Sequence, residues 1–482
     1  MEIEIVHAPH PGQPHRLCPV PVGQREPFAA AGPEVSRVAG ALAETREFTG
    51  EASQTLLVPT LDGQWLWVGL GEPEALTRPR FCEAVAKGFN ELRQAGAAEI
   101  SLLLPDRLPW AADEAARFAV EALWMAGYTF DRHRTRAKPR PKCEIELVAS
   151  DAAAATRGID RGEIVGRAIA LARDLINEPA AIATPAYVTE RAREVAGRLG
   201  AKVRVIEGDD LERQGYGAIH TVGRAAEHPP ALVALEWGES ESPVVALVGK
   251  GVTFDTGGLD IKTSQFMALM KKDMGGAATV LGAFQAIAEL GLPVRLIAVL
   301  GLAENAVGPR AYRPGDILRS KSGLTIEITN TDAEGRVVLA DALALAREFE
   351  PDYLVDFATL TGACRIALGK EVMGLFCDDP ALTAALRQSG EFTGDAVWPL
   401  PLWAPYKKKM ESQVADLVNA APDGMAGAVT AALFLQEFAG PVAWAHLDCY
   451  AWSDGDSPLF PKGGSGVGIR LMADFVERLS KG

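Results

Sequence analysis

The chain has 482 residues, of which 48% are hydrophobic and 23% are charged, so it can bury a large core, and its length favours two or three domains. A formal net charge of -15 argues against general binding to nucleic acid or anionic membrane, because such binding requires clustered Lys and Arg. The six cysteines contain no C-x-x-C pair, no run of about 18 apolar residues occurs, and the acidic N-terminus lacks the regions of a signal peptide. We therefore expect a cytoplasmic protein in a reducing compartment, with no membrane partner.

Residues 1–150 predict a smaller α/β domain. Strand-like runs alternate with helical patterns: strands at 55–59, 65–70, 99–104 and 143–148, and helices at about 74–95 and 110–127. The domain carries no dense set of chemical groups, since His7, His10 and His15 have no acidic or cysteine partner at ligand spacing. The basic segment 132–142, RHRTRAKPRPK, is interpreted as a solvated connector, with a nucleic-acid-binding arm as the alternative.

From 151 to 176 apolar residues recur at helical spacing and stop before Asn177-Glu178-Pro179, which predicts a connecting helix. Beyond it, strands are expected at 202–206, 231–237, 244–248, 294–300, 353–359 and 443–449, and helices at about 275–290, 335–349, 427–439 and 467–480. Runs such as VVALV and RLIAVL are almost continuously apolar, as in a sheet covered on both faces. We therefore predict that 177–482 form a larger C-terminal domain with a mixed, mainly parallel central sheet flanked by helices.

Polar residues suited to chemistry gather in two segments of this second domain, KGVTFDTGGLDIKTSQFMALMKKD at 250–273 and NTDAEGR at 330–336. Four carboxylates and three cations of these segments are the candidates for one site: Lys250, Asp255, Lys262, Asp273, Asp332, Glu334 and Arg336. Carboxylates crowded into one cleft repel one another unless cations neutralise them, and two divalent metals would cancel four negative charges. Hard oxygen ligands favour Zn, Mn, Co or Mg, and the shortage of nearby His and Cys argues against a softer site.

Each of these residues also has a structural interpretation. Asp255, before Thr-Gly-Gly, would accept backbone hydrogen bonds in a turn, and Asp273 would cap a helix. Thr331 has capping-box spacing with the glutamate of NTDAEGR, and the aspartate and arginine of that segment stand at i, i+4 like a surface ion pair. Lys250, at the end of the predicted strand, and Lys262 would be solvated. The combination favours a site, because both segments place carboxylates where strands end and helices begin.

Three stretches, VGKGVTFDTGGLDIK, MKKDMGGAA and NTDAEGRVVLADAL, closely resemble the signature of the leucyl aminopeptidase family of di-metal exopeptidases, also called cytosol aminopeptidases. The resemblance covers at least 165–365, and ARDLINEPA at 172–180 agrees with it. Residues 1–150 resemble the family's variable domain only in size and α/β pattern. The resemblance implies a homohexamer with the catalytic domains inside and an oligomeric or regulatory role for the N-terminal domain.

The resemblance also implies that two divalent metal ions, Zn or Mn with Co or Mg as alternatives, bind to this chain. Asp255 and Glu334 would bridge the two ions. Lys250 and Asp273 would serve the tighter site, and Asp332 would serve the more exchangeable one. Lys250 can act as a ligand only as the neutral amine, a deprotonation that an adjacent dication favours.

Lys262 and Arg336 match the two catalytic positions of the family. Lys262 would stabilise the oxyanion, and Arg336 would hold a bicarbonate that acts as the base. The free α-amine of the substrate would bind one metal with help from Asp273, which explains cleavage at N-termini. Positions that resemble the first-residue pocket and the backbone that holds the substrate are Met270, Thr359, Leu360, Gly362 and Ala451.

The sequence thus predicts a metal-dependent aminopeptidase that releases apolar, leucine-like N-terminal residues from short peptides with a free N-terminus. Two other classes of function stay open at this point. One is a DNA-binding regulator that uses the basic segment 132–142. The other is a different metallohydrolase, such as a phosphoesterase.

Overall fold

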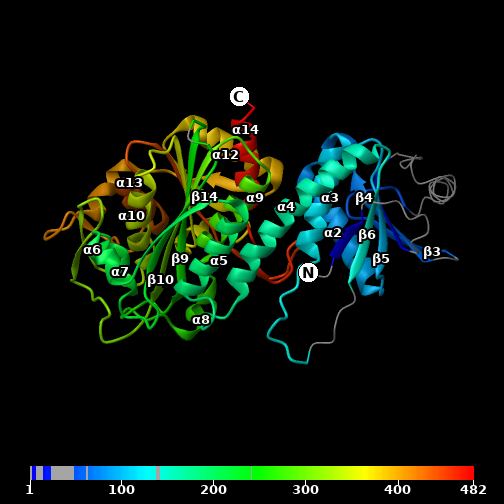
Figure 1. The fold of residues 1–482 in the computed structure, drawn as a ribbon. Coiled ribbons are helices and arrows are strands. Elements are labelled where there is room, and N and C mark those ends of the chain that lie inside the picture. The colour runs from blue at the N-terminus through cyan, green and yellow to red at the C-terminus, as the bar shows by residue number, and fades with distance from the viewer. Residues whose placement is uncertain are drawn as a thin grey trace. The chain divides into compact units, whose positions relative to one another are not determined.

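The computed structural model describes residues 3–6, 15–22, 48–60, 63–136, 142–239 and 241–481. The chain divides into two compact units, Met1–Ala170 with Ser453–Lys462, and Leu171–Trp452 with Gly463–Gly482 (Figure 1). The helix predicted over 151–176 is present as α4 (Ala152–Asn177), and the division between the units falls inside it. His7, His10 and residues 137–141 of the basic segment lie outside the described residues.

The first unit is built on a six-stranded sheet in the order β1-β6-β5-β2-β4-β3. The strands run parallel except at one edge, where β3 pairs antiparallel with β4. Helix α2 packs against α3 and against β2 and β4. The elements are β1 (Ile3–Val6), β2 (His15–Pro21), β3 (Thr55–Thr60), β4 (Gly63–Gly71), η2 (Pro73–Ala75), α2 (Arg78–Gln94), β5 (Glu99–Leu103), α3 (Ala112–Ala126) and β6 (Cys143–Val148). The predicted α/β alternation is confirmed.

The second unit is built on an eight-stranded sheet in the order β15-β14-β17-β13-β9-β10-β8-β7. Its four central strands, β17, β13, β9 and β10, are parallel, whereas β8 pairs antiparallel with both neighbours and β14 antiparallel with β17. The strands are β7 (Lys202–Glu207), β8 (Ala231–Trp237), β9 (Val244–Asp255), β10 (Arg295–Asn305), β13 (Tyr353–Ala358), β14 (Met373–Cys377), β15 (Val397–Pro399) and β17 (Ala443–Asp448). The mixed sheet with a parallel centre confirms the predicted fold class.

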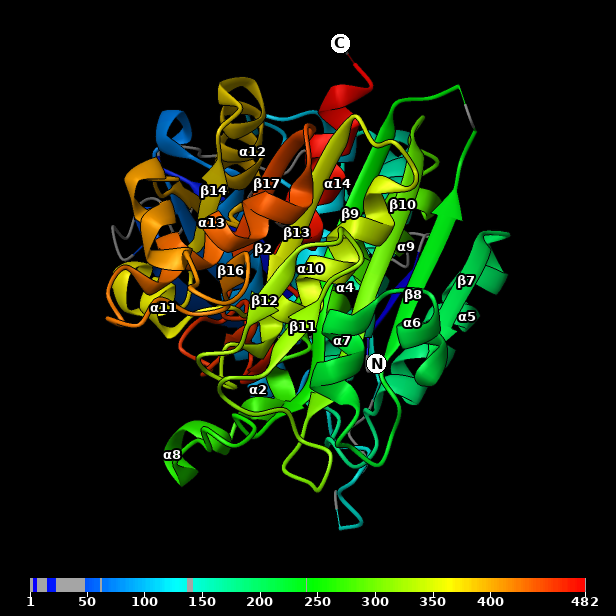
Figure 2. The same ribbon diagram turned by 90° about the vertical axis from the view of Figure 1, so that its left-hand side faces the viewer.

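Helices cover both faces of this sheet (Figures 1 and 2). On one face lie α5 (Pro185–Leu199), α9 (Gly275–Glu289), α12 (Pro380–Thr393) and α14 (Ile469–Leu479). On the other lie α7 (Gly217–Gly223), α10 (Glu334–Arg347) and α13 (Gly427–Ala439). Shorter elements are α6 (Asp209–Arg213), α8 (Ser264–Met267), η3 (Met270–Lys272), α11 (Gly362–Leu368), η4 (Ala404–Met410) and a small sheet of β11 (Ile317–Arg319), β12 (Thr325–Glu327) and β16 (Leu417–Val418). The central strands are therefore apolar on both sides, as their sequences predict.

Strand β9 is longer than the sequence predicts. The apolar run predicts a strand that ends at Val248, which would place Lys250 just after it, whereas the structure continues β9 to Asp255. The prediction was wrong because β10 pairs with β9 in parallel along this added length, and those hydrogen bonds sustain the strand through its polar residues. Lys250 consequently lies within the strand, and Asp255 is its last residue.

Two glycines allow α9 to lie directly on the central strands. A Cβ at Gly249 of β9 would stand 2.5 Å from the Cα of Ala277 in α9. A Cβ at Gly276 of α9 would stand 2.0 Å from the carbonyl oxygen of Phe357 in β13. Both distances are far shorter than van der Waals contact, so any larger residue at either position would push the helix away from the sheet.

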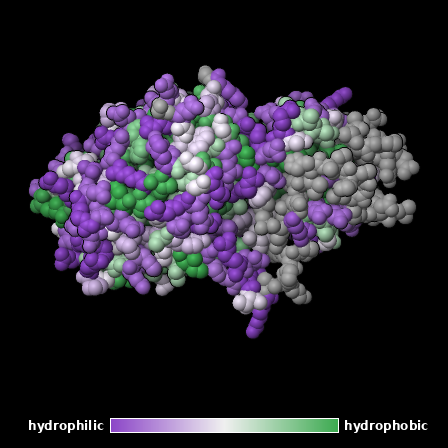
Figure 3. Space-filling view, viewed as in Figure 1, coloured by the Kyte–Doolittle hydropathy of each residue, from purple (hydrophilic) through white to green (hydrophobic). Residues whose placement is uncertain are grey.

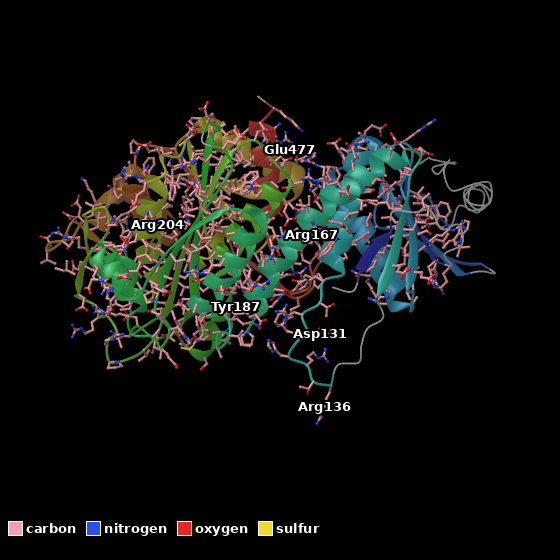
Figure 4. All side chains as sticks on the ribbon, in the orientation of Figure 1. Asp131, Arg136, Arg167, Tyr187, Arg204 and Glu477 are labelled. Atoms are coloured by element: carbon pink, nitrogen blue, oxygen red, sulfur yellow. The ribbon has the colours of Figure 1, made fainter. Side chains whose placement is uncertain are left out.

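Helix length and surface hydropathy bear on membrane association. In the described ranges no helix is long and apolar enough to cross a bilayer. Figure 3 shows hydrophilic residues over most of the viewed face of the second unit, with small hydrophobic areas between them. The described part of the basic segment, 132–136, is exposed, and Arg136 extends away from the ribbon in Figure 4. Exposure of these side chains is expected both of a solvated connector and of a nucleic-acid-binding arm, so both interpretations of the segment stay predictions.

The close packing of α9 predicts a large difference between two Gly→Ala variants of the second unit. Gly276→Ala should lower the melting temperature, because overpacking against the backbone costs about 1–3 kcal/mol. Gly197→Ala, in α5, should leave it unchanged or raise it, because nothing lies within 4 Å of the added Cβ and alanine favours helix. Thermal unfolding followed by circular dichroism measures both. Equal melting temperatures for the two variants would contradict the packing argument.

Candidate metal and catalytic site

The candidate site lies at the carboxyl ends of the four parallel strands. Asp255 ends β9, Asn305 ends β10, Asp448 ends β17, and Thr359 directly follows β13. Helix α9 connects β9 to β10, and helix α10 precedes β13. The two helices lie on opposite faces of the sheet (Figure 2). The chain therefore reverses its direction of winding beside β9, and the carboxyl edge at such a point is where open α/β sheets bind ligands.

Three buried carboxylates meet at this edge. Asp255, Asp273 and Glu334 each offer an oxygen, and these oxygens lie within 4.8 Å of one another. The ammonium Nζ of Lys250 lies 2.7 Å from Oδ2 of Asp273 and 2.9 Å from Oε1 of Glu334, and it donates to the Thr359 carbonyl at 3.2 Å. The two sequence segments are thus brought together by one lysine from the middle of β9.

Room for this lysine comes from Gly335, the second residue of α10. A Cβ there would stand 2.5 Å from Cε and 2.6 Å from Nζ of Lys250. The start of α10 can therefore approach the ammonium group closely only because this residue is glycine.

A second lysine joins a fourth carboxylate to the cluster. Lys262 Nζ lies 2.8 Å from Oδ2 of Asp255 and also forms an ion pair with Asp332. Both side chains are more exposed than the three-carboxylate group, with 14% for Lys262 and 34% for Asp332. Neither lysine is solvated in the way the structural interpretation required. The aspartate and arginine of NTDAEGR do not form the expected surface pair, because Asp332 contacts Lys262 instead.

Burial and crowding shift the pKa values of these groups. Burial, followed by the neighbouring carboxylates, raises the pKa of both Asp255 and Asp332 to about 6. Burial opposes the charge of Lys250 and Lys262, but the surrounding carboxylates outweigh it and raise both lysine pKa values. Burial also disfavours the charge of Glu334, yet the two lysines hold its pKa below the ordinary value. The cluster therefore depends on nearby positive charge to stay ionised.

The two segments are held together by hydrogen bonds around Thr331. Its hydroxyl donates to the Gly257 carbonyl at 2.6 Å and accepts from the Asp260 amide at 2.8 Å. The Asn305 side chain donates at 2.8 Å to Oδ1 of Asp255 and at 3.0 Å to the Thr331 carbonyl. The capping-box interpretation of Thr331 is wrong, because the N-cap of α10 is Ala333, without a side-chain cap. Thr331 instead links the two acidic loops.

Asp255 has the turn contact that its structural interpretation predicts, whereas Asp273 does not cap a helix. Asp255 does accept the Gly257 amide at 2.8 Å, as a turn aspartate would, so its structural and site roles coexist. Asp273 is not the N-cap of α9, because Met274 occupies that position. Its Oδ1 instead accepts the Thr359 hydroxyl at 2.7 Å, which fixes the carboxylate at the end of β13.

Arg336 lies behind the carboxylates on the first turn of α10. It is buried, with 8% of its surface exposed, and its Nη1 donates to the Asn419 carbonyl at 2.9 Å. Its Nε has no hydrogen-bond acceptor among the described residues. Burial lowers the pKa of Arg336 to about 10, so the guanidinium remains a cation at neutral pH.

A cavity of about 620 Å³ opens on the cluster. Its walls include all four carboxylates, both lysines and four of the five predicted substrate positions, Met270, Thr359, Leu360 and Gly362. The fifth, Ala451, is buried behind the wall, where its Cβ would lie 2.4 Å from a Cβ placed on Gly275. Arg336 is likewise not among the lining residues. The cavity thus brings six of the seven predicted metal and catalytic residues and most of the predicted pocket residues into one space.

Several residues of this site were absent from the sequence prediction. Asp448 accepts the backbone amides of Leu360 and Thr361 at 3.0 and 3.3 Å and thereby shapes the cavity wall. Asp448 and Asn305 both stand at the end of an apolar strand, and this position could have identified them as site residues from the sequence. Lys272, Arg365 and Tyr450 also line the cavity, and their signal was proximity to predicted pocket positions. Asn419 was not predictable, because nothing near it in the sequence marks a site.

The donor set fits a pair of divalent cations. Four carboxylates face two ammonium groups, which leaves a formal excess of two negative charges. Oε2 of Glu334 is buried without a hydrogen-bond donor among the described residues, although a buried carboxylate oxygen normally has one. Lys262 extends between Asp255 and Asp332, where those carboxylates attract a cation. Oxygen ligands of this kind suit hard or borderline metals.

Comparison with known proteins identifies the family. A family model described as the cytosol aminopeptidase family, catalytic domain, matches residues 170–473, and one described as the N-terminal domain of the same family matches residues 20–137. A probable cytosol aminopeptidase from Geobacter sp. (strain M21) is 44% identical over 455 residues, which are 91% of this chain and 91% of that protein.

Solved structures agree with these sequence matches. The bottromycin maturation enzyme BotP in complex with Mn is 36% identical, with a TM-score of 0.86, and the match covers 97% of this chain and 100% of that one. A cytosol aminopeptidase from Coxiella burnetii is 37% identical, with a TM-score of 0.81 and 96% of each chain covered. The resemblance found in the sequence motifs is confirmed. The chain therefore belongs to the cytosol aminopeptidase family and is a metal-dependent aminopeptidase.

Proposed function

We propose that this enzyme hydrolyses the N-terminal peptide bond of short peptides, with a preference for leucine-like first residues, by means of two divalent ions, Zn or Mn. The observation that carries the proposal is the meeting of three buried carboxylates within 4.8 Å at the carboxyl edge of the sheet. Asp255 and Glu334 would bridge the ions, and Lys250, Asp273 and Asp332 would complete the two sites. When bound, such a pair of cations lowers the pKa of a shared water and polarises the scissile carbonyl.

Lys262 would stabilise the negative oxygen that develops on the substrate carbonyl. Its Nζ lies in the cavity beside Asp255, and its raised pKa keeps it an ammonium, as this role requires. Arg336 would hold a bicarbonate that accepts a proton from the attacking water. The support for this is its buried Nε, which has no acceptor among the described residues and is therefore suited to an anion.

The substrate would be held by its free amine and its first side chain. Asp273, oriented by Thr359, would help to receive the amine together with a metal, so an acylated N-terminus would be rejected. Met270, Leu360 and Phe266 line the cavity and support an apolar first residue. Asp448 holds the Leu360 amide and so fixes the backbone beside the substrate.

The remaining proposals follow from the family. We assign residues 1–150 to a domain with an oligomeric or regulatory role, 151–176 to the connecting helix and 177–482 to catalysis. The assembly would be a homohexamer, and the enzyme would act in the cytoplasm on peptides. The relatives named cytosol aminopeptidases support this location.

The bridging role of Glu334 predicts loss of both metal and activity. Glu334→Ala should bind metal poorly and cleave leucine amide below detection, while its circular dichroism spectrum stays native. Metal content after reconstitution is measured by mass spectrometry. Turnover is measured with leucine amide and with N-acetyl-leucine amide, and the wild type should cleave only leucine amide. The control is Glu391→Ala, which removes an exposed glutamate of α12. Retained activity of Glu334→Ala would remove this residue from the bridge.

The role of Lys262 predicts a kinetic defect without metal loss. Lys262→Ala should retain both metals and lower kcat by about 10²-fold or more, as when a donor to an oxyanion is removed. Lys407→Ala, which removes an exposed lysine paired with Glu437, serves as the control. Steady-state kinetics on metal-saturated protein separates kcat from KM. An unchanged kcat would reject the assignment.

The raised pKa values of Asp255 and Asp332 predict that metal uptake depends on pH. Both carboxyls have a pKa of about 6 in the metal-free protein, so they are protonated below that pH and ionised above it. Metal binding requires the ionised form, and affinity should therefore rise between about pH 5 and 7. Calorimetric titration with Mn²⁺ in buffers of different ionisation enthalpy should show more protons released at about pH 5.5 than at about pH 7.5. Equal proton release at the two pH values would contradict these shifts.

A further inference from the structure

One part of the cavity wall does not suit a purely apolar substrate. Lys272, Arg365 and Tyr450 line the cavity that contains the carboxylate cluster. Lys272 ends the short helix η3, Arg365 lies on α11, and Tyr450 follows β17, so three separate elements bring these side chains together. Both cations pack against the same ring, with Lys272 Nζ 4.5 Å and Arg365 Cζ 4.2 Å from the centroid of Tyr450.

Lys272 is unusual because it is buried without an anionic or hydrogen-bonding partner of its own. Only 6% of its surface is exposed, and its ammonium has no hydrogen bond or ion pair among the described residues. The adjacent carboxylate of Asp273 is engaged by Lys250 and Thr359. A buried charge without such a partner is costly, and contact with an aromatic face offsets only part of that cost.

The neighbouring lysine shows that this arrangement is specific to position 272. Lys271 donates to the Asn177 carbonyl at 2.5 Å and is not among the residues that line the cavity. Arg365, in contrast, is exposed on the cavity wall and has no hydrogen bond or ion pair in the described part of the chain. The cavity therefore presents two cations that are both available to an anionic ligand.

These cations lie beside the positions predicted for the first residue of the substrate. Lys272 is two residues from Met270, Arg365 is three from Gly362, and both Met270 and Gly362 line the same cavity. An apolar side chain placed against Lys272 would leave its ammonium without a partner, and a basic side chain would be repelled. A side-chain carboxylate would pair with the ammonium and would accept two parallel hydrogen bonds from the guanidinium.

We propose that Lys272 and Arg365, supported by Tyr450, form a carboxylate-binding subsite, so that the enzyme also accepts peptides whose first residue is acidic, glutamate in particular. This inference rests on the proposed aminopeptidase function and extends its substrate class beyond leucine-like residues. Met270 and Leu360 serve the aliphatic part of the side chain, and the cation pair binds its end. Glutamate and glutamine have nearly the same shape, so a preference between them isolates the charge.

The test compares the amides of glutamate, glutamine, leucine and lysine with metal-loaded enzyme. The kcat/KM for glutamate amide should exceed that for glutamine amide by about 10-fold or more, as expected for charge-assisted hydrogen bonds. Lys272→Met and Arg365→Gln should each remove most of this ratio, mainly through KM, while leucine amide remains a substrate. Lys271→Met is the matched control and should leave the ratio unchanged.

Further measurements distinguish failure of the proposed subsite from failure of the proposed aminopeptidase function. If the enzyme cleaves leucine amide but does not distinguish glutamate from glutamine, the subsite is overturned and the aminopeptidase proposal stands. If Lys272→Met instead weakens the cleavage of Leu-Gly but not of Leu-Gly amide, the cations bind the peptide's C-terminus, which overturns the first-residue assignment. Calorimetry with free L-glutamate and L-glutamine tests the subsite without turnover. Tighter, Lys272-dependent binding of glutamate supports it even if no amide is cleaved, and equal binding of the two overturns it.

Discussion

The structure depends on one electrostatic constraint, the burial of several negative charges at a single edge of a sheet. Asp255, Asp273 and Glu334 lie too close together to remain ionised in a dry environment without positive charge among them. In the protein alone, Lys250 and Lys262 supply part of that charge. The remaining imbalance is the physical basis of metal dependence, because a divalent cation contributes two charges in the space of one.

The packing of the second unit serves this constraint. Acidic residues stand at the end of a strand and at the starts of helices, which the parallel sheet brings to the same edge. Small residues make the approach close enough: Gly335 admits the Lys250 ammonium, and Gly276 admits α9 to the sheet. Thr331 then links the two loops that carry the carboxylates. Fold and site are therefore not separable in this region.

Much of this organisation was predictable from local sequence. Most central strands and their covering helices were found because their sequence pattern is set by burial, although β14 and α12 were not predicted. The acidic residues were found because their spacing matches a known signature. What failed was long-range: β9 continues to Asp255 only because β10 pairs with it, and Thr331 binds a loop 71 residues away. Helix α5 was not predicted, although Thr184 caps its start and a proline follows. These local signals would have been enough to predict it.

The side chains proposed to perform the reaction and those that line the far wall of the cavity are carried by different kinds of structure. The former are fixed by sheet pairing and by glycines that tolerate no added atom. The latter include Arg365, on an exposed seven-residue helix, and Lys272, at the end of a three-residue turn. A substitution at the exposed Arg365 would therefore disturb less packing than one within the buried carboxylate cluster. Proteins that share this scaffold can therefore differ in substrate specificity while they retain the same reaction chemistry.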